Sequence, residues 1–202
     1  ASTTVTLVGT STLKLGDSTW GSGNLTFANG NDNAVPFRFG TTTTAFTAAT
    51  GTVTFTGTGA NIIIATTTYY NLTLTPTSTA AINTFRFGAK GNTCTSSGCT
   101  ATTTVSNALT VSGYAHADFN STALILSGSG TVFSKANGTF VANGSLIKYT
   151  NASAATDVAT GTYDNLVISG ADITKTLLGN TTATSTVAIE SGTLAITTST
   201  FT

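Results

Sequence analysis

The sequence predicts an all-β protein, and a right-handed parallel β-helix is the architecture that its patterns favour. Three observations lead to this prediction. Apolar and polar residues alternate in many short segments, the periodicity of amphipathic helices is missing, and similar segments recur about 47 residues apart. Gly, Asn, Asp and Ser separate the segments at intervals of about 8 to 12 residues, a spacing typical of sandwiches, barrels and solenoids.

The individual strands follow from this alternation. Residues 52–56 and 71–75 alternate strictly between polar and apolar side chains, and branched Thr and Val, which favour extended backbone, occupy many of these positions. Gly followed by Thr or Ser precedes several of the segments, as expected for a turn that leads into a strand. In chain order, the clearest expected strands are residues 4–7, 23–27, 51–56, 62–65, 70–75, 144–148, 164–168 and 192–196.

The repeat is clearest in three segments that share an Asn-Leu pair, Gly23–Phe27, Tyr70–Leu74 and Asp164–Ile168. Their Asn residues lie 47 and then 94 positions apart, so a degraded copy is expected at residues 118–122. Half of this repeat, about 23 residues, suits one coil of a parallel β-helix, in which each coil buries its apolar face against its neighbours. We therefore expect a single all-β domain over residues 1–202.

A β-sandwich of the jelly-roll type is the alternative architecture, because short strands at this spacing occur in both folds. The two folds differ in where they place the repeated Asn-Leu strands. These strands stack in one sheet of a β-helix, whereas they occupy dissimilar places in a sandwich.

Composition excludes several classes of function. Seven acidic and seven basic residues give no net charge, and the basic residues are scattered singly, whereas a nucleic-acid-binding surface needs a basic cluster. No apolar run approaches the roughly 20 residues of a membrane-spanning helix. Thr makes up about a quarter of the chain, but the regular Val, Ile, Leu and Phe and only two Pro argue against a disordered stalk.

The cysteines and the first residues indicate an extracellular or cell-surface location. Cys94 and Cys99 flank a short polar loop and are expected to form a disulfide, which implies an oxidising compartment. A metal-binding role would need further Cys or His nearby, and the only histidine is His116. The chain begins at Ala1 without Met, as expected for a mature product whose signal peptide has been removed.

Three segments, Gly51–Gly59, Thr68–Leu74 and Thr162–Gly170, resemble the repeats of large bacterial and archaeal cell-surface β-helix proteins of the adhesin type. The resemblance is good over residues 50–75 and 144–197 and looser elsewhere. It implies a secreted scaffold or adhesin repeat without catalytic residues.

The composition is also similar to that of the Thr-rich subunits of archaeal and bacterial extracellular filaments. Those subunits are β-sandwiches linked by strand donation. If this resemblance holds, Val5 and Leu7 lie on a strand that is donated to a neighbouring subunit.

Candidate catalytic and metal-binding residues are few. The seven acidic residues form no repeating stripe, and His116 and Asp118 read as a lone pair in a polar turn. Asn29–Asn33 offers oxygen ligands at the spacing of a calcium loop, but it lacks the acidic residue that would close the site, so we interpret it as a turn. We expect no enzymatic activity, no metal and no cofactor.

Asn-x-Ser/Thr sequons are frequent, and chance alone predicts about five in a chain this rich in Asn, Ser and Thr. The third Asn-Leu copy, at Asn165, is not a sequon, which favours a backbone-turn role for the repeated Asn. The candidate glycosylation sites are Asn24, Asn71, Asn120, Asn137, Asn143, Asn151 and Asn180.

These observations together predict a structural subunit of an extracellular filament or cell-surface layer that assembles with itself and has adhesion as a further role. Alternating apolar residues continue to both ends of the chain, at Val5 and Leu7 and at Leu194 and Ile196, without a polar capping segment. Surface glycans are a second expected partner. The alternative is a carbohydrate- or ice-binding module, because the clusters Thr41–Thr44 and Thr66–Thr68 could display flat arrays of hydroxyl and methyl groups; the sequence shows no regular Thr-x-Thr in every coil.

Overall fold

The computed structural model describes residues 23–28, 36, 49–77, 83–88, 101–197 and 199–202 in full, and it describes the backbone alone for strands at 4–8, 13–15, 18–19, 37–39, 46–47, 94–95 and 98–99. Every helix or strand in this described part is a β-strand. The predicted all-β class is therefore confirmed.

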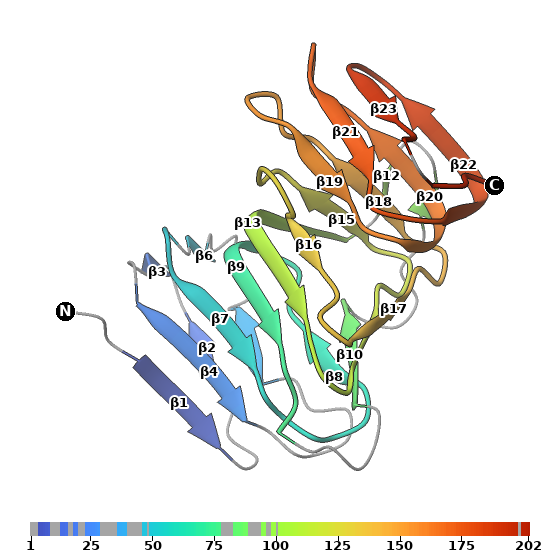
Figure 1. Cartoon of the computed structure of the whole chain (residues 1–202). Helices are drawn as coiled ribbons and strands as arrows, with labels where there is room; N and C mark the ends of the chain where they lie inside the picture. Colours follow the sequence, from blue (N-terminus) through green and yellow to red (C-terminus); the bar gives the residue numbers. More distant parts are fainter. Residues whose placement is uncertain are drawn as a thin grey trace.

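A single ten-stranded sheet runs the length of the molecule (Figure 1). Its neighbouring strands are parallel, and each strand belongs to a later coil of the chain than the strand before it. In spatial order the strands are β1 (Thr4–Val8), β4 (Asn24–Ala28), β7 (Thr52–Phe55), β9 (Thr68–Leu74), β13 (Thr102–Val111), β15 (Ala123–Leu126), β18 (Leu146–Tyr149), β20 (Gly161–Ile168) and β22 (Thr181–Ile189), while β16 (Phe133–Ser134) pairs with the second half of β13.

Shorter sheets form the other sides of the coils. One is parallel and contains β8 (Ile62–Ile64), β10 (Asn83–Phe87), β14 (Ala115–Asp118) and β17 (Thr139–Val141); another, also parallel, contains β19 (Thr156–Val158), β21 (Thr174–Leu177) and β23 (Thr193–Ala195). Three strand pairs complete the set, β2 (Leu13–Leu15) with β5 (Phe37–Phe39), β3 (Ser18–Thr19) with β6 (Phe46–Thr47), and β11 (Cys94–Thr95) with β12 (Gly98–Cys99).

This stacking of parallel strands is a β-solenoid, so the favoured β-helix is confirmed over the sandwich. The Asn-Leu strands β4, β9 and β20 all lie in the ten-stranded sheet, as the β-helix required. Coil length varies around the predicted value: Ile147 pairs with Leu166, 19 residues later, and Leu25 pairs with Val53, 28 residues later. The degraded copy expected at residues 118–122 begins at the end of β14 and continues into the turn before β15.

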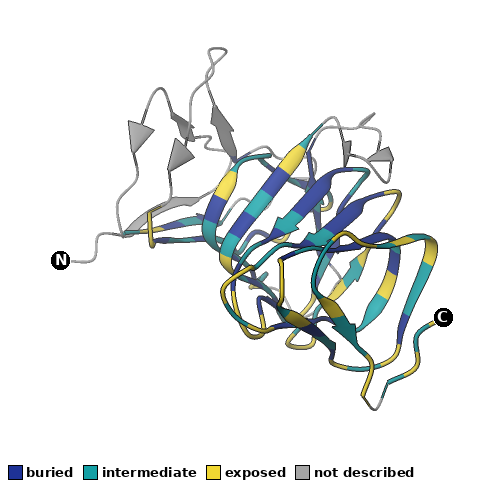
Figure 2. Ribbon diagram, turned by 90° about the horizontal axis from the view of Figure 1, so that it is seen from above, coloured by how far each residue is buried: buried dark blue, intermediate teal, exposed yellow. Residues whose placement is uncertain are grey.

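The core lies inside the coils. Alternate residues of the strands point inward, and Figure 2 shows buried and partly exposed residues alternating along them. Inward aromatic rings stack from coil to coil: Phe27 lies 5.1 Å from Phe55 between ring centroids, and Phe119 lies 5.6 Å from Phe140. Each coil therefore depends on its neighbours for burial of its apolar residues.

Candidate functional site

The last coil leaves the interior of the solenoid open. Val187 and Ile189 of β22 pair in register with Leu166 and Ile168 of β20, which are fully buried. The same inward positions on β22 are 39% and 54% exposed, because no described coil stacks on their outer side. Ile196, in the residues after β23, is 50% exposed as well. The C-terminal end of the molecule is therefore an apolar surface, which we call the open end and define by Val187, Ile189 and Ile196.

The backbone of β22 is also partly open. The amides of Thr181 and Ala183 donate to the carbonyls of Thr200 and Thr202, so residues 200–202 begin to pair with the first part of the strand. From residue 184 to residue 189, no strand in the described part of the chain pairs with the outer side of β22. This segment is an edge that a further parallel strand could extend.

The opposite end of the sheet is formed by β1. The predicted donated-strand residues Val5 and Leu7 lie on this strand, and β1 pairs in parallel with β4 of its own chain. Val5 and Leu7 occupy the register positions of Leu25 and Phe27, which are buried in the core. Both ends of the sheet thus carry apolar residues at the inward register positions.

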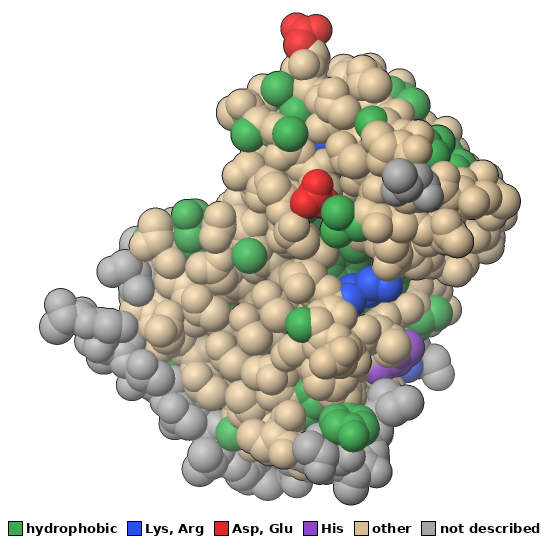
Figure 3. Space-filling view, in the orientation of Figure 1, with side chains coloured by type: hydrophobic (Ala, Val, Ile, Leu, Met, Phe, Trp, Pro, Cys, Tyr) green, Lys and Arg blue, Asp and Glu red, His purple; other side chains and the backbone are tan. Residues whose placement is uncertain are grey.

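Charged side chains are sparse on the face seen in Figure 3, where most side chains are uncharged and polar. Those that are described connect neighbouring coils. Lys148 Nζ lies 2.6 Å from Glu190 Oε2, and hydrogen bonding to this lysine lowers the pKa of the exposed Glu190 carboxyl. Lys175 is buried, its ammonium donates to the carbonyl of Asn151 at 2.7 Å, and burial lowers its pKa.

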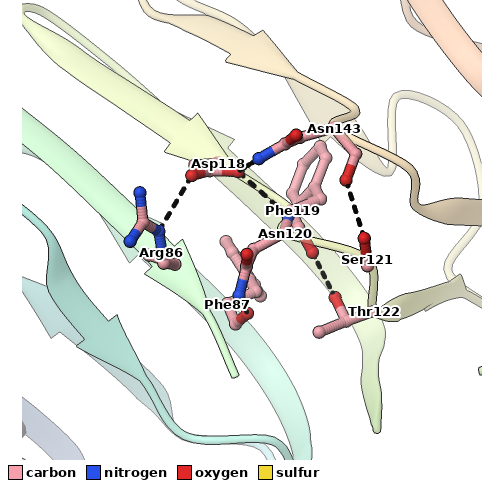
Figure 4. A network of polar contacts seen from close by, with 8 residues as sticks. All are labelled: Arg86, Phe87, Asp118, Phe119, Asn120, Ser121, Thr122 and Asn143. Atoms are coloured by element: carbon pink, nitrogen blue, oxygen red, sulfur yellow. Dashed lines mark hydrogen bonds and ion pairs between the residues drawn. The ribbon is translucent and has the colours of Figure 1, made fainter. Parts of the chain in front are cut away.

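Asp118 lies at the centre of a polar network after β14 (Figure 4). Its carboxylate accepts hydrogen bonds from Arg86 Nε at 2.9 Å, from Asn143 Nδ2 at 3.1 Å and from the amide of Asn120 at 3.0 Å. His116, the neighbour singled out by sequence, contacts Thr139 Oγ1 at 2.8 Å instead. Asn120 has a positive φ of 41°, so the network stabilises a strained corner and ties three coils together.

The other acidic residues are similarly occupied. Asp157 accepts from Thr131 Oγ1, and Asp164 accepts from the amide of Gly144 and from Thr184 Oγ1. Within the described ranges, no three His, Cys, Asp or Glu residues lie close enough to hold a metal ion. Nor does any described helix have the length and apolarity needed to cross a membrane. Asp17, Asp32 and the rest of the calcium-like segment Asn29–Asn33 lie outside the described residues.

Cys94 and Cys99 lie on β11 and β12, where they are directly opposite each other in an antiparallel pair. Cross-strand Cα atoms in such a pair are about 4.5 to 5.5 Å apart, within the range that a disulfide spans. The backbone is thus compatible with the predicted disulfide, which stays a prediction.

The sequons differ in whether their amide nitrogen is available. Nδ2 of Asn71, Asn120, Asn143 and Asn151 donates a hydrogen bond to a neighbouring coil. By contrast, Asn24 and Asn180 use only their Oδ1, which accepts a backbone amide hydrogen bond in each case. Asn137 is exposed and forms no side-chain hydrogen bond to a described residue. Asn24, Asn137 and Asn180 are accordingly the sequons whose modification would disturb the coils least.

A shallow pocket of about 550 Å³ lies beside Asn137. It is lined by Gly113, Tyr114, Ala115, Asn137 and Thr139, all of them uncharged, and Tyr114 is largely exposed. An aromatic ring next to amide and hydroxyl groups suits a neutral polar ligand such as a sugar, so this pocket is where the predicted glycan partner would fit best.

No family model, no curated protein and no solved structure matches this chain in comparisons with known proteins. The fold defines its class as a parallel β-solenoid protein. The resemblances to adhesin repeats and to filament subunits stay expectations from sequence.

Proposed function

We propose that this chain is a structural subunit that assembles with itself, head to tail, into an extracellular filament or cell-surface layer. The observation that carries the proposal is the open end, where the inward column of the solenoid continues onto an exposed face. The proposal includes no enzymatic activity.

The two ends of the sheet are complementary in direction. Strands β1 and β22 are the outer strands of one parallel sheet, so a second copy placed beyond β22 presents its own β1 in the parallel direction. Val5 and Leu7 would then occupy the register columns that end at Val187 and Ile189. Because the two contacting surfaces differ, such an interface does not close on itself and produces an open fibre. This is strand addition between subunits, which keeps a terminal role for Val5 and Leu7.

Magnitudes suggest that assembly depends on concentration. Complete burial of a half-exposed aliphatic side chain contributes about 1 kcal/mol. Three such side chains do not offset an association cost of at least about 4 kcal/mol, so the backbone ladder along β22, at about 1 kcal/mol for each hydrogen bond, must contribute too.

The test is negative-stain imaging and sedimentation of the purified full chain over a range of concentrations. Fibres or growing oligomers are expected for the natural sequence. Val187→Lys should abolish them, because it places a charge in the stacking surface. Val141→Lys is the matched control: Val141 is 40% exposed, against 39% for Val187, but it lies on β17, at the side of the solenoid.

Monodisperse natural protein at every concentration would contradict the proposal. So would fibres of the Val187→Lys variant that form as readily as those of the natural chain.

A further inference from the structure

The outer face of the ten-stranded sheet carries a column of threonines that the sequence does not reveal. Thr26 pairs with Thr54, Thr54 with Thr73, and Thr73 with Thr110, so one register position holds Thr on four successive strands. Ser134 of β16 continues the column, and Thr6 of β1 occupies the same register position at the other end.

A second column runs beside the first, two residues further along the chain. It contains Thr56, Thr75 and Ser112, whose amides donate to the carbonyls of the preceding coil at 2.7, 2.9 and 3.0 Å and so extend the ladder beyond the strand ends. Neighbouring strands are about 4.8 Å apart, and alternate residues of a strand about 6.6 Å apart. The two columns therefore form a regular lattice of hydroxyl and methyl groups, which we call the threonine array.

The hydroxyl groups of the central column are available to a ligand. No described residue forms a hydrogen bond with the side chains of Thr26, Thr54, Thr73 or Thr110, and all four are partly exposed. Figure 3 views the molecule from this side, and the surface over β4, β7 and β9 shows no acidic or basic side chain. Because Thr is branched at Cβ, its χ1 is restricted, and the lattice is held in place before any ligand binds.

The array is confined to one half of the sheet. On the strands that follow, the outward column contains Ile125, Lys148, Val167 and Ala188. The general preference of strands for Thr therefore does not explain the array, because outward positions of the same sheet carry other residues a few coils later.

We propose that the threonine array binds a crystal face of ice. A rigid, uncharged lattice makes many weak contacts at once with a ligand that is itself periodic, and the array's two spacings are comparable to the repeats of water molecules in ice. Hydroxyl groups hydrogen-bond to ordered water, while the methyl groups favour contact with a surface that is only partly hydrated. A crystalline polysaccharide suits the array less, because no outward residue of the two columns is aromatic and could stack on a sugar ring.

Ice binding is tested by the gap between melting and freezing temperatures of a small crystal in a solution of the full chain, and by the shape of the crystal. The natural sequence should produce a measurable gap and a faceted crystal. Thr54→Lys and, separately, Thr73→Tyr should lose most of the gap, since each places a bulky group above the lattice. Both positions point outward, and circular dichroism and thermal melting would verify that the variants fold.

Thr174→Lys on β21 is the matched control, because this exposed outward threonine lies outside the array. It should retain the full gap. Absence of a gap for the natural chain, or an undiminished gap in both array variants, would overturn the proposal. Co-sedimentation with microcrystalline cellulose or chitin, in the absence of any effect on ice, would overturn it in favour of a polysaccharide ligand.

Discussion

Two buried tyrosines close a ring of hydrogen bonds inside the solenoid. Tyr163 donates to the carbonyl of Ala159 at 2.5 Å, and the amide of Ala159 donates to the Tyr149 hydroxyl at 3.1 Å. The two hydroxyl oxygens are 3.1 Å apart, and since the proton of Tyr163 is used by the carbonyl, Tyr149 donates to Tyr163. Tyr69 repeats part of this arrangement, because its hydroxyl donates to the carbonyl of Ala65 at 2.8 Å.

These tyrosines predict a loss of stability at high pH. Burial raises the pKa of Tyr149 to about 12 and raises those of Tyr69 and Tyr163 further, whereas an unfolded tyrosine titrates near pH 10. Above about pH 10 the unfolded chain releases protons that the folded chain retains, so the free energy of unfolding should fall between about pH 10 and pH 12. Buried Lys175, whose pKa is lowered, acts in the opposite direction and only below its ordinary pKa near 10.4.

Chemical denaturation at a series of pH values measures this loss. Tyrosine absorbance should report that the buried rings ionise only as the protein unfolds. Tyr149→Phe should destabilise the protein by about 1 to 3 kcal/mol at pH 7, because the Ala159 amide loses its acceptor, and should reduce the alkaline slope. Full ionisation of all tyrosines near pH 10 in the folded protein would contradict the prediction.

At the scale of elements, the repeat found in the sequence corresponds to a structural corner. Residues 65–72 and 159–166 share the pattern Ala-Thr-x-Thr-Tyr-x-Asn-Leu, 94 positions apart. In both copies the tyrosine hydroxyl donates to the carbonyl four residues earlier, and the asparagine side chain donates to the preceding coil. The repeated Asn thus connects coils, a structural role of the kind that its sequence context favoured over glycosylation.

The hairpin of β11 and β12 carries the prediction for the cysteines. Cys94 and Cys99 are expected to be oxidised, and a cross-link over so short a loop removes only about 2 to 3 kcal/mol of chain entropy from the unfolded state. Mass spectrometry with and without reduction before alkylation should detect the bond. The Cys94→Ser/Cys99→Ser variant should melt at a slightly lower temperature and keep its assembly, because the hairpin belongs to neither outer strand of the ten-stranded sheet. Quantitative alkylation without reduction would contradict the bond.

At the scale of the whole molecule, the proposed interfaces lie on different surfaces. The open end lies at the terminal coil, and the threonine array lies on the side of the coils before β15. We therefore expect the two activities to separate: Val187→Lys should abolish fibres and keep the effect on ice, and Thr54→Lys should do the reverse. Joint loss of both activities in either variant would show that the surfaces are coupled.

The solenoid also explains which parts of the site were predictable. The uncapped ends were visible as alternation that continues to Leu194 and Ile196, since a strand pattern is local. The partners of Asp118 were not visible: Arg86 and Asn143 lie 32 and 25 residues away, on neighbouring coils. The Thr clusters singled out by sequence do not form the array, as residues 66–67 precede β9 and Thr68 starts it outside both columns, while 41–44 lie outside the described residues.

By itself, the sequence determined that this chain is all-β, that its strands repeat, and that its Asn-Leu segments belong to one sheet, because alternation and turn residues act over a few neighbouring positions. Only the tertiary structure decided which strands stand next to each other. Successive register partners are 28, 19 and 37 residues apart from Leu25 through Val53 and Leu72 to Leu109, so no constant period aligns the threonines. Backbone pairing between coils sets that register, and it brings Thr26, Thr54, Thr73 and Thr110 into one column.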